Sequence, residues 1–264
     1  EEIDTDTFVK IARDACEEFG KGDVTDARWA PFAEMLSYVS QGAGPHALAE
    51  AVHVSEAVLA RHGDEGRRLH YLSVPPKAAL DVVRQLDEAK LVERSRIIME
   101  KPFGTDLQTA KKLNARLHEV FDEEQIFRID HFLGKEAVQN LLALRFANAL
   151  FEPAWDRRSI ASVQVDVPET LAMEGRGSFY ESTGALRDMV STHLFQILGA
   201  VALEDPGEWS ADAVRRARSA VFRDVRPLDP ARVVLGQYDG YRDEDDVDED
   251  STVETFVALE AWVD

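Results

Sequence analysis

At residues 128–136 the chain reads Arg128-Ile129-Asp130-His131-Phe132-Leu133-Gly134-Lys135-Glu136. Apolar Ile126 and Phe127 come just before and predict a short buried strand. Beyond the stretch, apolar side chains recur at helical spacing and predict a helix, at Val138, Leu141, Leu142, Phe146, Ala149 and Leu150. Gly134 lets the backbone turn between the two elements. The ionisable side chains therefore lie at a strand-to-helix junction, where α/β proteins place ligand sites.

Strands and helices alternate on the amino-terminal side of this stretch. Apolar runs predict strands at residues 35–40, at 68–74 and, running into a turn, at 96–104. Helical periodicity falls at residues 5–20, 29–34, 47–61, 78–91 and 105–121, the last with Thr105 or Asp106 as its N-cap. This order predicts a parallel, doubly wound sheet up to about residue 125.

A glycine-containing segment, Gly42-Ala43-Gly44-Pro45-His46-Ala47, formally matches a dinucleotide-binding fingerprint between a strand and a helix. The fingerprint needs an acidic residue at the end of the next strand for the ribose, and none is found there. We therefore interpret the segment as a glycine turn with Pro45 at a helix start.

The pattern changes after residue 150. Strands are predicted at residues 159–167, 232–238 and 252–263, and the last is apolar on both faces, as in a covered strand. Helices are predicted from Glu181 or Ser182 to about Val201, after a loop at residues 174–180, and at residues 211–220 behind Ser210 as N-cap. Residues 239–250 are strongly acidic and predict a mobile, solvated loop.

Composition limits the classes of function. The 264 residues are 45% hydrophobic and carry a net charge of −20, which argues against nucleic acid or an anionic membrane as partner. No uninterrupted apolar run is long enough to span a bilayer. The single cysteine, Cys16, excludes an intrachain disulfide and fits a reducing cytoplasm. An anionic substrate would need a local group of basic residues, for which Arg128, His131, Lys135 and Lys101 are the candidates.

As a set, residues 128–136 closely resemble the substrate-site signature of the glucose-6-phosphate dehydrogenase family, R-I-D-H-Y-L-G-K-E, with Phe132 in place of the usual tyrosine. Other segments resemble the family in the same order: 71–76, 100–104, 144–148, 184–188 and 234–238. The resemblance implies a Rossmann-like parallel sheet in residues 1–125, incomplete at its amino terminus. It implies an α+β domain in residues 126–264, with a mainly antiparallel sheet that is incomplete at its carboxyl terminus.

The resemblance also implies a function. The family oxidises D-glucose 6-phosphate to 6-phospho-D-glucono-1,5-lactone and transfers a hydride to NADP, with NAD also possible. This is the first step of the oxidative pentose phosphate pathway, and we expect a cytoplasmic homodimer or homotetramer. The family's glycine-rich coenzyme loop and carboxy-terminal part have no match here, so we expect an internal segment that binds NADP poorly and is inactive on its own.

Two other functions stay open on the residues alone. A non-catalytic paralogue or fragment, serving as a binding or assembly subunit, is favoured by Phe132 and by the missing coenzyme loop. A related sugar oxidoreductase could act on an unphosphorylated sugar or on an anion placed differently.

The resemblance assigns roles to the catalytic and phosphate-binding residues. His193 matches the base that removes the anomeric hydroxyl proton, and Asp130 would orient its imidazole. His131 and Lys135 would bind the phosphate. Without the resemblance, His193 reads as a core histidine because apolar residues surround it in the sequence.

The remaining roles concern the sugar and the coenzyme. Lys101, before Pro102, would contact both substrate and coenzyme, although alone it reads as a turn lysine. Glu169 and Asp188 would bind sugar hydroxyls, and either could equally be a surface charge. We expect no metal site, since no Cys/His cluster has zinc spacing.

Overall fold

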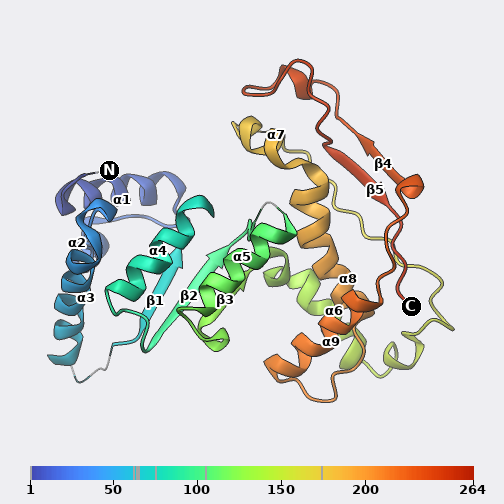
Figure 1. The fold of residues 1–264 in the computed structure, drawn as a ribbon, viewed down its shortest axis with the longest axis horizontal. Coiled ribbons are helices and arrows are strands. Elements are labelled where there is room, and N and C mark those ends of the chain that lie inside the picture. Colours follow the sequence, from blue (N-terminus) through green and yellow to red (C-terminus); the bar gives the residue numbers. More distant parts are fainter. Residues whose placement is uncertain (1, 62, 64–65, 75, 105, 174) are drawn as a thin grey trace. The chain divides into compact units, whose positions relative to one another are not determined.

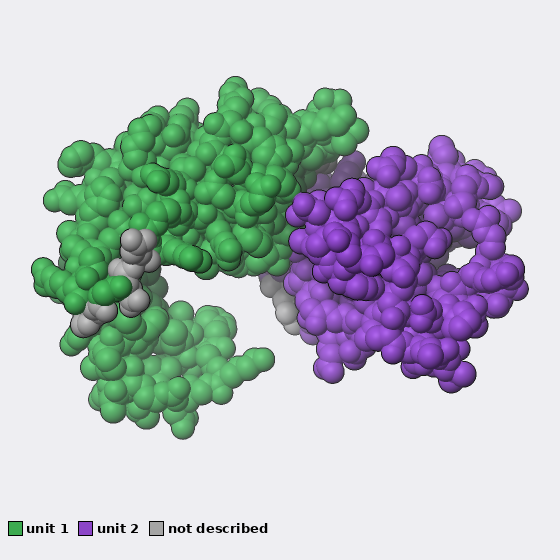
Figure 2. All heavy atoms as spheres, turned by 90° about the horizontal axis from the view of Figure 1, so that it is seen from below, with its two compact units in different colours: residues 1–129 green, residues 130–264 purple. Residues whose placement is uncertain are grey.

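The computed structural model describes residues 2–61, 63, 66–74, 76–104, 106–173 and 175–264. It divides the chain into two compact units, Glu1–Ile129 and Asp130–Asp264 (Figure 2). Thr105, Pro75 and Glu174, which the sequence assigns to a cap, a strand end and a loop, lie outside the described residues. Among the helices that the structure describes, none is both long and apolar enough for a bilayer crossing.

The first unit is built on a parallel sheet in the order β1-β2-β3 (Figure 1). Its strands are β1 (Arg68–Leu72), β2 (Ser95–Glu100) and β3 (Ile126–Ile129). Helices α4 (Pro76–Glu88) and α5 (Leu107–His118) make the crossovers that parallel strands require. The predicted parallel α/β sheet is therefore confirmed.

The core of this unit lies between the sheet and its helices. Side chains alternate in β2, so that Ile97 and Met99 are buried on one face. They join a cluster with Leu72, Ala79, Val83, Leu86, Leu91, Leu113, Leu117, Phe121 and Ile126. Burial of this apolar surface holds the strands in place, and with them the residues that follow their carboxyl ends.

A tight turn joins β2 to α5. Lys101-Pro102 is a cis peptide, and Gly104 has φ of 132°. A Cβ on Gly104 would lie 2.6 Å from the backbone nitrogen of Ala110, so this turn requires glycine. Asp106 is the N-cap of α5, because its carboxylate accepts a hydrogen bond from the Thr109 N–H at 2.7 Å.

The helices before the sheet are α1 (Thr5–Phe19), α2 (Asp26–Ala33) and α3 (Gly44–Arg61), the last preceded by the 3₁₀ turn η1 (Gln41–Ala43). The strand predicted at residues 35–40 is wrong, because this segment pairs with no strand among the described residues. The Tyr38 N–H instead donates to the Thr5 hydroxyl, and the Tyr38 ring lies 5.3 Å from that of Phe8. Tyr38 thus packs on α1. The segment 42–47 forms η1 and the first turn of α3, as the glycine-turn interpretation predicts.

The second unit is mainly helical. It contains η3 (His131–Gly134), α6 (Glu136–Phe146), α7 (Gly177–Ala185), the π-helix η5 (Leu186–Leu194), α8 (Phe195–Ala202) and α9 (Ala211–Asp224). Strands β4 (Val233–Gly236) and β5 (Phe256–Leu259) pair antiparallel. Ser210 caps α9 as predicted, by accepting the Ala213 N–H at 3.3 Å. The antiparallel sheet of an α+β unit is confirmed.

Two strand predictions in this unit need correction. Residues 159–167 form no strand, because no described segment pairs with them, and Val163 is 49% exposed. The strand predicted at 252–263 is reduced to β5 plus an isolated bridge at Val263. It is not covered on both faces, since Phe256 and Trp262 are 54% and 59% exposed.

The long helix predicted up to Val201 is also different in detail. It begins at Gly177. It is interrupted at Gly184, just before α7 ends and η5 begins. The acidic segment 239–250 is anchored rather than a free loop. Tyr241 is 1% exposed and donates to the Glu181 carboxylate at 2.6 Å, and the Ser251 hydroxyl donates to the same oxygen.

The partial burial of His70 makes the first unit sensitive to acid. His70 Nε2 donates to the Leu91 carbonyl at 3.0 Å, and burial lowers the pKa of its imidazole. The unfolded chain therefore binds a proton below about pH 6.5 that the folded chain resists. We expect the free energy of unfolding to fall more between about pH 7 and pH 5 in the parent than in His70→Gln. Urea denaturation at both pH values measures this, and identical pH dependence of the two proteins would contradict it.

Candidate active site

A hydrogen bond between a carboxylate and a buried imidazole joins the two ends of the candidate site. Asp130 follows β3 directly and begins the second unit. Its Oδ1 lies 2.6 Å from Nδ1 of His193, and the two side chains are 13% and 0% exposed. The same oxygen accepts the N–H of Phe132 at 2.9 Å, so the carboxylate also caps η3. A buried carboxylate needs such partners, because desolvation otherwise disfavours its charge.

The π-helix η5 carries His193 to this position. Such helices bond each residue to the fifth one before it and are frequently found at functional sites. Helix α8 continues from η5 and packs against both α6 and η3. The junction at 130–135 and the imidazole at 193 are thus held by packing within one unit.

An aromatic ring lies next to both His193 and Lys135. The Phe132 ring is 3% exposed, and its centroid lies 4.3 Å from that of His193 with 17° between the planes. Nζ of Lys135 lies 3.6 Å from the Phe132 centroid. The Phe132 ring therefore contacts both groups. The ammonium and the imidazole centre are then no more than about 8 Å apart, the sum of these two distances.

His131 completes this group. Its ring centroid lies 4.5 Å from that of His193, with 71° between the ring planes. His131 and Lys135 are exposed, whereas His193 is enclosed. The site therefore has a buried acid–base pair and, beside it, two cationic or hydrogen-bonding groups open to solvent.

The two carboxylates assigned to the sugar share a neighbour, Tyr180. Burial raises the pKa of the Tyr180 phenol to about 12, and the charges of Asp188, Glu254 and Glu169 add to the shift. Asp188 lies in the first turn of η5 and is half-buried, while Glu169 is exposed. Sequence reasoning missed Tyr180, because residues 174–180 were interpreted only as a loop entering a helix.

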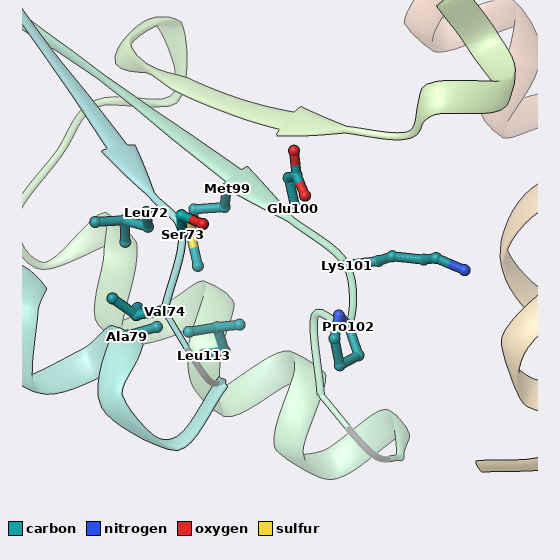
Figure 3. Close-up of a pocket in the computed structure, with 9 residues that line it drawn as sticks. All are labelled: Leu72, Ser73, Val74, Ala79, Met99, Glu100, Lys101, Pro102 and Leu113. Atoms are coloured by element: carbon teal, nitrogen blue, oxygen red, sulfur yellow. The ribbon is translucent and has the colours of Figure 1, made fainter. Parts of the chain in front are cut away.

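Lys101 lies in the first unit. It follows β2 and lines a cavity of about 270 Å³ with Leu72, Ser73, Val74, Ala79, Met99, Glu100, Pro102 and Leu113. Figure 3 shows its side chain pointing away from the apolar residues of this cavity. The cavity lies at the carboxyl ends of parallel strands, where α/β sheets bind ligands.

Arg128 does not belong to the expected basic group. Its guanidinium forms an ion pair with Glu123 at 3.1 Å and donates to the side-chain oxygen of Asn114. The charge of Arg128 is thus paired within the first unit. His131, Lys135 and Lys101 remain as candidates for binding an anion.

The distances also bear on metal binding. Ligand atoms of Asp130, His131 and His193 lie within 4.8 Å of one another, which an ion could bridge. Two ligands of one tetrahedral zinc ion lie roughly 3.3 Å apart, given bonds of about 2.0 Å. The 2.6 Å between Asp130 and His193 is shorter and is a hydrogen-bond distance.

Comparisons with known proteins find the same family along nearly the whole chain. The family model "Glucose-6-phosphate dehydrogenase, NAD binding domain" matches residues 1–140, and the C-terminal domain model of the same family matches residues 142–264. "Glucose-6-phosphate 1-dehydrogenase 1" of Mycobacterium tuberculosis is 42% identical over 257 residues, which are 97% of this chain and 53% of that protein. "Glucose-6-phosphate 1-dehydrogenase 6, cytoplasmic" of Arabidopsis thaliana is 41% identical, over 85% of this chain and 45% of that protein.

Solved structures give the same result. The crystal structure of glucose-6-phosphate 1-dehydrogenase from Mycobacterium avium has a TM-score of 0.86 and 41% identity, covering 100% of this chain and 57% of that one. A glucose-6-phosphate dehydrogenase in complex with its substrate has a TM-score of 0.87 and 35% identity, with the same coverage. The chain spans about half the length of the curated relatives it matches.

Proposed function

Because the chain belongs to the glucose-6-phosphate dehydrogenase family, we propose that it carries the catalytic base and the phosphate site of an NADP-linked glucose-6-phosphate dehydrogenase. The observation that carries the proposal is the buried pair of Asp130 and His193, with the Lys135 ammonium within a sugar's length of it. The substrate is D-glucose 6-phosphate and the product 6-phospho-D-glucono-1,5-lactone.

His193 and Asp130 handle the proton. Asp130 accepts the Nδ1–H of His193, which leaves Nε2 as the nitrogen that takes the proton of the anomeric hydroxyl. As that proton leaves, the C1–O bond becomes a carbonyl and C1 loses a hydride. The carboxylate of Asp130 then stabilises the imidazolium, as in a serine-protease triad.

The enclosure of His193 adds a requirement. Its side chain is 0% exposed, so a neighbouring side chain must move before a sugar hydroxyl reaches Nε2. His131 is the exposed ring in edge-on contact with His193, and rotating it toward a bound phosphate would open this face. Catalytic contacts often tighten only when substrate binds.

His131 and Lys135 bind the phosphate in this proposal. Lysine supplies a point charge, and imidazole adds a directed donor. Asp188 and Glu169, whose charges both act on Tyr180, accept hydrogen bonds from the sugar hydroxyls. A protein that served only as a scaffold would have no physical need for a buried pair beside an exposed ammonium. This argument disfavours the non-catalytic alternative.

A nicotinamide coenzyme, when bound, accepts the hydride. Residues 1–140 match the family's NAD binding domain, so the cofactor class is a nicotinamide dinucleotide, and NADP rather than NAD is our proposal. The cavity at the carboxyl ends of β1 and β2 fits such a group, since apolar Leu72 and Met99 lie beside polar Ser73 and cationic Lys101. Lys101 is the residue that we propose contacts it.

Location and assembly belong to the same proposal. The single Cys16 is suited to the reducing cytoplasm, and one relative is named as cytoplasmic. Exposed apolar side chains on the β4–β5 sheet, with Val234 at 61% and Phe256 at 54%, favour a homodimer or homotetramer.

Removing the base tests the proposal directly. In the complete gene product, His193→Ala should lower kcat for glucose 6-phosphate oxidation by about 10²- to 10⁴-fold, because the proton loses its acceptor. The assay follows reduced-nicotinamide absorbance. His53→Ala, which removes an exposed histidine of α3, is the matched control and should keep the parent rate. A His193→Ala enzyme as fast as the parent excludes His193 as the base.

Restoring the tyrosine of the family signature tests the phosphate site. Phe132→Tyr adds a hydroxyl next to Lys135, and a hydrogen bond to a charged group contributes about 1.5–3 kcal/mol. We expect KM for glucose 6-phosphate to fall by roughly tenfold or more, since about 1.4 kcal/mol corresponds to a factor of ten. KM for unphosphorylated glucose should stay as in the parent. Equal effects on both sugars would argue that no phosphate is bound there.

A further inference from the structure

The helical run that carries His193 is broken once, at Gly184. This glycine lies one residue before the end of α7 and has φ of 70° and ψ of 165°, so the helix is broken there and a new helical start follows. The first N–H groups of a helix have no partner inside it, and a side chain at the preceding residue normally accepts one of them. Glycine has no side chain with which to do this.

Glu254, just before β5, supplies the missing cap from 68 residues away. Its Oε1 accepts the Leu186 N–H at 2.9 Å, and its backbone carbonyl accepts the Ala185 N–H at 2.9 Å. A carboxylate at a helix start is also favoured by the helix dipole. The fit is close, because a Cβ on Gly184 would lie 2.6 Å from this Oε1. The carboxylate of Glu254 can therefore approach this closely only because residue 184 has no side chain.

This cap lies at the start of the segment that carries the site. Asp188 falls in the first turn of η5, and His193 falls near its end. Helix α8 continues the run beyond η5, and its far end is held as well, since Arg145 donates to the carbonyls of Ala200 and Leu203 at 2.6 and 2.7 Å. With both ends held, the rotation of η5 about its axis is set, and that rotation brings the imidazole to Asp130.

We propose that Glu254 is a positioning residue of the active site, whose carboxylate oxygen caps η5 and thereby sets His193 against Asp130. This inference rests on the proposed function for its kinetic readout. Glu254 acts through the helix and contacts no reacting atom in this scheme. The length of its side chain matters more than its charge, because the contact is a hydrogen bond to one backbone N–H.

Three substitutions separate length from charge. Glu254→Gln keeps an oxygen at the same reach, Glu254→Asp keeps the charge on a shorter stem, and Glu254→Ala removes both. We expect kcat to fall by about 10- to 100-fold in the Ala and Asp variants, as for a small misplacement of a catalytic group. Glu254→Gln should stay within about threefold of the parent. If Glu254→Asp is faster than Glu254→Gln, the capping role is overturned, even where Glu254→Ala does not fold.

A second readout is independent of turnover. NMR titration of histidine ring signals, assigned by comparison with His193→Gln, reports the pairing of His193 with Asp130. The His193 titration should shift in Glu254→Asp and match the parent in Glu254→Gln. If the parent oxidises no glucose 6-phosphate, the proposed function fails, whereas this titration still tests the cap. Unchanged His193 signals in Glu254→Asp would refute it.

The control is a helix cap of the same kind elsewhere in the unit. Ser210→Ala removes the cap of α9, whose oxygen accepts the Ala213 N–H at 3.3 Å. It should lower Tm as a lost cap does, while kcat and the His193 titration stay as in the parent. A Ser210→Ala enzyme with the same kinetic defect as Glu254→Asp would show a general effect of stability and overturn the proposal.

Discussion

The hydrogen bond between Asp130 and His193 is the constraint on which the second unit depends. It joins residues 63 apart in sequence at 2.6 Å, and both side chains are largely removed from solvent. Burying a carboxylate is costly unless its oxygens are paired, and here one oxygen serves both the imidazole and the Phe132 N–H. The turn after β3 and the helix at 193 must therefore be correct together, because an error in either leaves a buried charge without its partner.

Contacts with other segments hold the helical run that contains His193. The segment from Leu186 to Ala202 is held at its start by Glu254 and at its end by Arg145. Arg145 is 6% exposed, and burial lowers the pKa of its guanidinium, so its two carbonyl contacts offset a real desolvation cost. Trp155 adds a third contact at this end, from its indole N–H to the Val201 carbonyl at 3.0 Å. These contacts hold the two ends of the helical run that contains the π-helix.

Local signals in the sequence predicted much of this. The parallel strands, the cap at Asp106 and the strand-to-helix junction at 128–136 depend on neighbouring residues, and all three are present. The predictions failed where partners are distant. An apolar run at 35–40 forms a strand only if it hydrogen-bonds with a neighbouring strand. Here Tyr38 packs on α1 instead. The π-helix and the role of Glu254 depend on contacts made across 68 residues, and no local pattern encodes them.

The net charge of −20 has a consequence for kinetics. At long range a chain of this charge repels an anion, and in the proposed site attraction begins only near Lys135, whose ammonium lies 3.6 Å from the centre of an aromatic ring. Dissolved ions screen fields beyond about 8–10 Å but leave direct contacts largely intact. Moderate ionic strength should thus speed the encounter with an anionic substrate, the reverse of what is usual where electrostatic steering is favourable.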